Sequence, residues 1–401
     1  NNSMTVRVSK PEFNLREKIT ELDKPSGVKG NELLRSETTQ EARDLIGAGR
    51  KNMVINGQMF INQRNSTSSY AIPHGTGGSY GGPDRWAVNE ATDGSVSVNM
   101  DGDPYHSNGY GSEVQEFVKA FQIACSGTSG ALSSTHNVHF FQIIEGYNII
   151  PLGWGTSGAK SATLSFWVRS NVFGTYCVGL ENENTNRCCI REYEIKPVNK
   201  WQKVVLTFPP CTDGTWNTIH GIGIRLRFAL ASGSQFADGV DGKWVNSDEL
   251  TTGNQVNFMT STNNRFFITG VQLEVGENAT EFEHRSFAEE MVLCHRYYQQ
   301  IEGYSDLIMF GSGRANGTTE AQVAVPLTVP LRASPSIPSL DYSAWGISNA
   351  TGTTDGQPTV TRWFEDSSII HLGFPSSGLD NARTVVVSCR NGSTLQLNSE
   401  L

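Results

Sequence analysis

The feature that most limits how this chain folds is a two-residue alternation of apolar and polar side chains. It is clearest over residues 222–230 and recurs over 164–169, 204–208 and 267–275. Because successive side chains of a strand point to opposite faces, this alternation predicts strands with one buried face. The chain also has 41 glycines, many of them in the turn-rich stretches between these segments. We therefore expect a mainly β protein built around a jelly-roll β-sandwich.

The balance of charges excludes one large class of function. The chain has 31 Lys and Arg against 40 Asp and Glu, a formal net charge of −9. Proteins that coat nucleic acids need an excess of basic residues to bind phosphates, so no nucleic-acid partner is expected. There is no run of 18 apolar residues, so membrane insertion is not expected either.

Seven cysteines are present, and no two have the C-x-x-C spacing. The odd number and the spacing favour reduced thiols packed on strands, as in a chain folded in a reducing cytosol. A zinc site from Cys188, Cys189 and Cys211 would lack the usual ligand spacing. Asp101 and Asp103 could hold a structural Ca²⁺, although a tight turn is the simpler interpretation. We expect no cofactor and no metal.

The first fifty residues follow a helical pattern instead. Leu15, Ile19 and Leu22 recur at helical spacing, and Leu45 and Ile46 lie on one side of a second short helix. Two short amphipathic helices cannot bury their apolar stripes alone. We expect this segment to dock outside the chain's own core, with a helical cap on the β-domain as the alternative.

A third helical pattern separates two β-rich regions. Ser286 and Glu289 form a capping box, and the pattern is assigned to a connector helix over 286–302. We expect four parts: a helical segment 1–52, a β-sandwich 53–285, the connector 286–302, and a small C-terminal β-domain 303–401.

Short motifs in a fixed order resemble the tail-fibre and appendage proteins of tailed bacteriophages, in particular those of marine phages. The N-terminal matches are residues 24–28, 31–35 and 42–49. The following matches resemble a jelly-roll module similar to carbohydrate-binding modules: 52–57, 84–86, 164–169, 221–228, 267–276, 281–285 and 294–298. Residues 329–335 match the family's terminal domain more loosely.

The resemblance implies a virion appendage, usually a homotrimer, with a helical N-terminal part for attachment to other virion tail proteins. In that case the residues that dock on the virion are Leu15, Ile19, Leu22, Leu45 and Ile46. We expect the β-domains to contact the host surface, with a cell-surface glycan as partner. The expected location is the virion, in its tail or another surface appendage, after assembly in the host cytoplasm.

Glycan binding needs exposed aromatic rings that stack on the C–H faces of sugars, with polar groups nearby for the hydroxyls. The aromatic candidates in turn-rich stretches are Tyr105, Tyr110, Trp244, Tyr342, Trp345 and Trp363. For each of them, loop packing or a contact between subunits is the competing interpretation.

Other conspicuous residues are assigned structural roles. Trp167 and Trp201 lie inside strand patterns and are expected in the core or at a subunit interface. Trp86 is expected in the core, with Asp84 and Arg85 in a local ion pair.

Two other functional classes stay open. One is a purely structural collar, adaptor or capsid decoration protein without a receptor. The other is a polysaccharide depolymerase, which needs two carboxyl groups at about 5 Å or roughly 6.5–9.5 Å. Glu181 with Glu183 and Glu192 with Glu194 share strand faces, but such pairs are common on solvated sheets. There is no G-x-S-x-G, H-E-x-x-H or P-loop motif, so we expect the protein not to be an enzyme.

Overall fold

A computed structural model describes residues 51–401 with gaps, together with Arg35. The gaps are 65–68, 76, 102–113, 115, 197, 303–307, 339–344, 349–357, 365, 382 and 390–393. The chain forms two compact units, Asn1–Lys51 and Asn52–Leu401. In the first unit only Lys51 and Arg35 are described, Arg35 as an exposed helical residue. The following predicted docking residues therefore lie outside the described residues: Leu15, Ile19, Leu22, Leu45 and Ile46.

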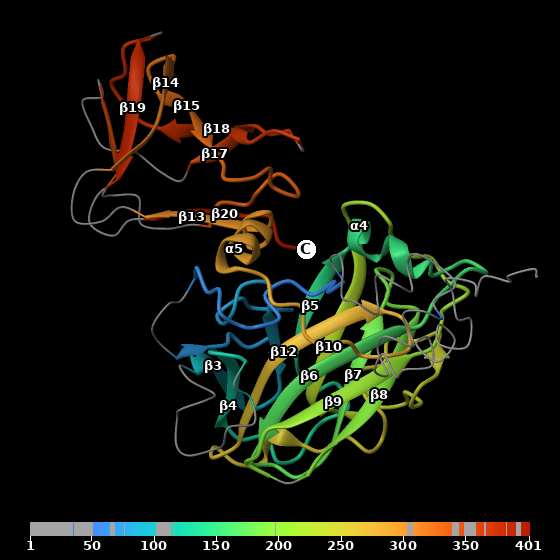
Figure 1. The fold of residues 1–401 in the computed structure, drawn as a ribbon. Helices are drawn as coiled ribbons and strands as arrows, with labels where there is room; N and C mark the ends of the chain where they lie inside the picture. The colour runs from blue at the N-terminus through green and yellow to red at the C-terminus, as the bar shows by residue number, and fades with distance from the viewer. Residues whose placement is uncertain are drawn as a thin grey trace, which may run out of the picture. The chain divides into compact units, whose positions relative to one another are not determined.

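Most of the second unit is a sandwich of two six-stranded antiparallel sheets (Figure 1). Sheet A has the order β1 (Tyr70–Ala71), β3 (Ser95–Asp101), β4 (Ala120–Gly127), β12 (Arg265–Val275), β6 (Ala162–Ser170), β9 (Gln202–Phe208). Sheet B has the order β11 (Trp244–Val245), β8 (Cys188–Ile195), β7 (Gly174–Glu181), β10 (Ile222–Ser232), β5 (Asn137–Glu145), β2 (Ala87–Ala91). The predicted mainly β, jelly-roll architecture is confirmed.

Short helical turns connect some of these strands. They are α4 (Gly146–Ile149), η3 (Ile150–Leu152), η4 (Ser234–Phe236) and η5 (Phe258–Thr260). No helix among the described residues has the length and apolar composition needed to cross a lipid bilayer.

The core between the sheets consists of the apolar positions of the alternating pattern. Phe228 on β10 stacks on Phe140 of β5, with ring centroids 4.8 Å apart. It also meets Phe166 of β6 edge-on at 5.2 Å, which joins sheet B to sheet A. Trp86 is fully buried beside these rings, as predicted for the core. Each large apolar side chain buried in this way contributes about 1.5–3 kcal/mol to stability.

The described cysteine side chains are free thiols inside this fold. They are Cys125, Cys177, Cys188, Cys189, Cys211 and Cys294, and all are buried. Burial raises the pKa of Cys177 and of Cys188 to about 11. These two thiols therefore stay protonated at neutral pH, which makes them poor nucleophiles and poor metal ligands.

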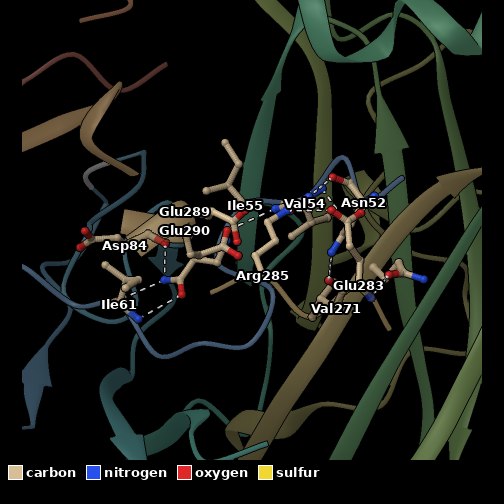
Figure 2. A network of polar contacts seen from close by, with 12 residues as sticks. Asn52, Val54, Ile55, Ile61, Asp84, Val271, Glu283, Arg285, Glu289 and Glu290 are labelled. Atoms are coloured by element: carbon tan, nitrogen blue, oxygen red, sulfur yellow. Dashed lines mark hydrogen bonds and ion pairs between the residues drawn. The ribbon is translucent and has the colours of Figure 1, made fainter. Parts of the chain in front are cut away.

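A buried polar network joins the start of the sandwich to the segment that leaves it (Figure 2). The backbone N–H of Asn56 donates to Oε1 of Glu290 at 2.5 Å, and its side-chain amide donates to the Asp84 carbonyl at 3.0 Å. Arg285 donates to the Val54 carbonyl at 3.0 Å and lies within 3.3 Å of Glu290. Several of the ordered motifs thus meet here, and their polar residues hold distant segments together.

Arg85 and Asp84 do not form the predicted local ion pair. Arg85 instead donates to the Ile143 carbonyl at 2.6 Å, pairs with Glu400, and lies 3.5 Å from the Tyr297 ring centroid. Asp84 accepts hydrogen bonds from other residues, including both nitrogen donors of Gln63. The side chains of adjacent residues point in different directions, so Asp84 and Arg85 contact different segments of the chain.

The helix α5 (Phe287–His295) begins with the predicted capping box. The Ser286 hydroxyl accepts from the Glu289 backbone N–H, and the Glu289 carboxylate accepts from the Ser286 N–H. The helix is shorter than the predicted range 286–302. Its end is set by β13 (Tyr298–Glu302), which pairs along its whole length with β20 (Thr394–Asn398).

The C-terminal β-domain has its own six-stranded sheet. Its strand order is β16 (Trp345–Ile347), β19 (Thr384–Cys389), β14 (Ile308–Asn316), β15 (Glu320–Pro326), β18 (Ile369–Pro375), β17 (Thr359–Arg362). Alternate positions such as Val323, Leu372 and Val385 form a core separate from that of the sandwich. The C-terminal part of the fold prediction is confirmed as well.

Candidate functional site

The six predicted glycan contacts do not form one site among the described residues. Tyr105, Tyr110 and Tyr342 lie outside the described residues, and of Trp345 only the backbone in β16 is described. Trp363 follows β17 and packs half-buried against the C-terminal core. Trp244 belongs to sheet B of the sandwich.

Trp244 is one of three indole rings that pack edge to face at the end of the sandwich. Its ring centroid lies 5.0 Å from that of Trp154 and 5.6 Å from that of Trp216. Its indole N–H donates to the Pro209 carbonyl at 2.9 Å. Ring packing and the hydrogen bond hold Trp244 in place, which corresponds to the competing interpretation of loop packing.

A different aromatic group lies on the outer face of sheet A. On β6, Phe166 and Val168 belong to the main core, so Trp167 and Arg169 project from the opposite side of the strand. Phe267 on the neighbouring β12 projects from the same side, between two core residues. Trp201, just before β9, packs with these rings in a separate small cluster. We call Trp167, Arg169, Trp201 and Phe267 the aromatic face.

The strand register fixes how these side chains lie relative to one another. Phe267 is directly opposite Arg169, and Trp167 is directly opposite Thr269. Trp167 and Phe267 are therefore diagonal neighbours, whose backbones are roughly 7–8 Å apart and whose rings are within reach of each other. The Arg169 guanidinium carbon lies 4.0 Å from the Phe267 ring centroid and 5.3 Å from that of Trp201. This cation packs on the rings and limits their movement.

The aromatic face is only partly covered by protein. Trp167 and Phe267 are half-buried, whereas Arg169 and Trp201 are buried beside them. Val205 on β9 continues the same outer face and is 48% exposed. Two half-exposed rings on a rigid sheet, next to polar neighbours, form a surface on which the C–H face of a sugar can stack.

Polar side chains border the two rings on three strands. Gln122 of β4 is directly opposite Phe267, and Lys203 of β9 is directly opposite Trp167. Asn99 on β3 is opposite Gln122 and exposed. Amide and ammonium groups at these positions can donate hydrogen bonds to hydroxyl or carboxylate oxygens of a ligand.

The strand patterns predict Trp167 and Trp201 in the core or at a subunit interface, but the alternation also indicates on which side of its strand Trp167 lies. Leu164, Phe166 and Val168 already take the inward positions of that strand. A residue between them must face outward, so the alternation itself places Trp167 on an outer face. How much of the Trp167 ring stays exposed depends on which other segments pack over the strand, and the alternation does not predict this.

The outer face of sheet B carries a buried charged cluster. Arg227 on β10 donates to Glu181 Oε1 and to Asp248 Oδ1, each at 2.9 Å, and to the Glu249 carbonyl at 2.8 Å. Burial raises the pKa of Glu181 to about 8, and Arg227 opposes this rise. Burial also pushes the pKa of Asp248 upward, but Arg227 and the hydrogen bond from Glu181 outweigh it, so that pKa is lowered. Burial therefore favours the neutral form of Glu181, whereas Arg227 favours the charged form of Asp248.

This cluster fastens a covering segment to sheet B. Phe236 and Leu250 from the segment after β10 pack on Cys177, Ile190 and Ala229 of the sheet. The Glu181 side chain is fully buried, and Arg227 pairs with both Glu181 and Asp248. The predicted partner of Glu181, Glu183, instead accepts a hydrogen bond from Asn217 at 3.0 Å.

His139 also faces this side of sheet B, beside Asn137 at 3.1 Å. Burial and, to a smaller extent, the charge of Arg227 lower its pKa to about 3. Within the described part of the chain, no three His, Cys, Asp or Glu side chains are grouped so that they could hold a metal ion.

Comparison with known proteins gives structural similarities only. No family model matches the chain, and no curated protein matches it. Among solved structures, the enzymatically active domain of tailspike protein 4 from bacteriophage CBA120 is similar at 12% identity and a TM-score of 0.29. That match covers 56% of this chain and 21% of the tailspike chain.

Two further similar structures are smaller proteins. A protein described as sugar-binding from Bacteroides thetaiotaomicron is 12% identical, with a TM-score of 0.30, over 56% of this chain and 100% of that chain. A family 11 carbohydrate-binding module from Clostridium thermocellum, solved with a mixed-linked tetrasaccharide, is 9% identical, with a TM-score of 0.26. It covers 55% of this chain and 99% of the module.

Proposed function

We propose that the protein is an appendage subunit of a tailed-phage virion that binds a host-surface glycan through the aromatic face. The observation that carries the binding role is the pair of half-exposed rings, Trp167 and Phe267, on adjacent strands of sheet A. The ordered motifs that resemble phage tail-fibre proteins support the virion role. The location on the virion and the attachment through residues 1–52 are part of the same proposal.

In this proposal the protein binds the glycan without cleaving it. The carboxyl groups that the sequence offers as catalytic pairs are held by protein groups. Glu181 is buried against Arg227, and Glu192 accepts hydrogen bonds from Thr252 and Asn254. The aromatic face offers rings, amides and cations, which recognise a sugar but do not protonate a glycosidic oxygen.

A single open sheet face gives a weak sugar contact, so the number of copies matters. If three subunits assemble, as in the proteins that the motifs resemble, the second and third contacts form at a high effective concentration. Avidity of this kind would hold a particle on a cell without tight binding at any one site.

The test compares the aromatic face with an exposed aromatic residue elsewhere. Trp167→Ala and Phe267→Ala should each lower binding to host cells or a glycan array at least about tenfold, because truncating a central aromatic contact removes most of the stacking. Phe287 on α5 is 57% exposed and lies outside this face. The variant Phe287→Ala therefore serves as the matched control and should bind like the wild type.

The result that would overturn the proposal is equal binding by all three variants while their thermal unfolding remains normal. A wild-type protein that binds no glycan would favour the structural collar or adaptor. Release of reducing ends from a host polysaccharide would instead favour a depolymerase and contradict binding without cleavage.

A further inference from the structure

Basic side chains accompany the aromatic face on three neighbouring strands. Lys203 is directly opposite Trp167, and Arg169 is directly opposite Phe267. Arg265 precedes Phe267 by two positions on β12 and therefore lies on the same face. Lys203 is exposed and Arg265 is half-exposed, so both are accessible to a ligand from solvent.

Among the described residues, no carboxylate forms an ion pair with Lys203 or Arg265. Arg265 uses one terminal nitrogen, at 2.8 Å, for the carbonyls of Thr262 and Asn264. Surface lysines and arginines usually have acidic neighbours in a chain with more acids than bases, and this chain has 40 against 31. The absence of acidic partners at Lys203 and Arg265 among the residues that the structure describes is therefore informative.

The described acidic groups that border this face are already engaged. Glu116 lies 3.3 Å from His284. Glu274, farther along β12, accepts hydrogen bonds from Thr280 and from Gln272. Neither carboxylate forms an ion pair with Lys203 or Arg265.

We infer that the aromatic face selects an anionic polysaccharide, whose negative charge comes from uronate carboxylates or sulfate esters. The inference rests on the proposed glycan binding and adds the charge of the ligand. The two rings stack on the sugars, while Lys203 and Arg265 bind the acidic groups of the same or the next sugar. A planar guanidinium matches the two oxygens of a carboxylate or sulfate, and the ammonium of lysine acts as a compact positive charge.

The experiment measures binding of the full chain to three polymers: neutral agarose, alginate as the carboxylated probe, and carrageenan as the sulfated probe. The double variant Lys203→Gln, Arg265→Gln removes two charges from the face. Lys160 and Lys243 are exposed and lie outside sheet A. The double variant Lys160→Gln, Lys243→Gln removes the same net charge and is the matched control.

We expect the wild type to bind at least one acidic polymer more tightly than agarose, and the relative affinity of alginate and carrageenan identifies the acidic group. The face variant should lose about tenfold in affinity for that polymer, and the control should lose less than twofold. Raising the salt concentration should weaken the wild type by a similar factor, because exposed charges are screened.

Two outcomes separate this inference from the proposed function. If agarose binds as tightly as the acidic polymers and Trp167→Ala abolishes that binding, the charge preference is wrong and glycan binding stands. If Trp167→Ala leaves binding to all three polymers unchanged, glycan binding by this face is wrong. Binding to none of the polymers, or equal losses in the two double variants, also overturns the charge preference.

Discussion

The outer faces of sheet A and sheet B arise from the same alternation of side chains, but other segments of the chain cover them to different extents. On sheet B, Phe236 and Leu250 cover the strands, and Arg227 is paired with carboxyl groups. On sheet A, Phe117 and Phe282 cover part of the outer face, and Trp167 and Phe267 remain half-buried at its centre. A buried charge must be paired, whereas an open charge is free to meet a ligand. The covered face is therefore the structural one, and the open face is the candidate for binding.

The largest effect expected from this contrast is on stability. Arg227→Ala leaves the buried Glu181 and the loop carboxylate of Asp248 without their shared cation. The Glu181 carboxyl and the Glu249 carbonyl each lose a hydrogen-bond partner, and each buried polar group left unsatisfied costs about 1–3 kcal/mol. We expect the free energy of unfolding, measured by urea titration, to fall by about 4 kcal/mol. Arg265→Ala on the open face should change it by less than about 0.5 kcal/mol.

If Arg227→Ala and Arg265→Ala lowered the free energy of unfolding by similar amounts, the two outer faces would not differ as described. The bases on both faces would then contribute equally to stability. The slope of the urea titration should stay the same in both variants, so that the midpoint alone reports the loss.

The next effect is on the pH dependence of stability. The carboxyl of Glu181 titrates near 4.5 in the unfolded chain and, raised by burial, near 8 in the folded protein. Between these values the folded state holds a proton that the unfolded state has lost, so stability falls as pH rises. The contribution of Glu181 to the free energy of unfolding is fully present below about pH 4.5 and disappears as the pH rises past about 8.

We expect the free energy of unfolding to decrease by about 3–4 kcal/mol between pH 5 and pH 8 because of this group. Glu181→Gln keeps a neutral side chain at every pH and should remove that part of the decrease. Lys203→Gln, on the open face, should leave the profile unchanged. An unchanged profile in Glu181→Gln would show that Glu181 is already ionised in the folded protein at neutral pH.

The strands of the two sheets can be predicted from the sequence, but the difference between their outer faces cannot. The positions of Phe166 and Phe228 in the core follow from alternation, and Ser286 marks the start of α5 from local chemistry alone. Which outer face is covered depends on where the segment containing Leu250 packs. The pairing of Arg85 with Glu400 likewise joins positions far apart in the chain, and no local pattern encodes such a contact.

The smallest effect tests whether the open face meets a glycan or another subunit. Val205 on β9 is 48% exposed, and Val240, near sheet B, is 45% exposed. Val205→Asp and Val240→Asp should each change the free energy of unfolding by less than about 0.5 kcal/mol, since neither side chain is buried. If the aromatic face is free for a ligand, both variants should also keep the wild-type oligomeric state in sedimentation analysis.

A charge inside a subunit interface is costly, because it loses its water without gaining a partner. Dissociation of Val205→Asp but not of Val240→Asp would therefore mean that the open face of sheet A is buried between subunits, and the glycan contact would have to lie elsewhere. Unchanged assembly with weaker binding of acidic polymers to Val205→Asp would instead support the open face as the binding surface, because the added carboxylate repels the ligand beside Lys203.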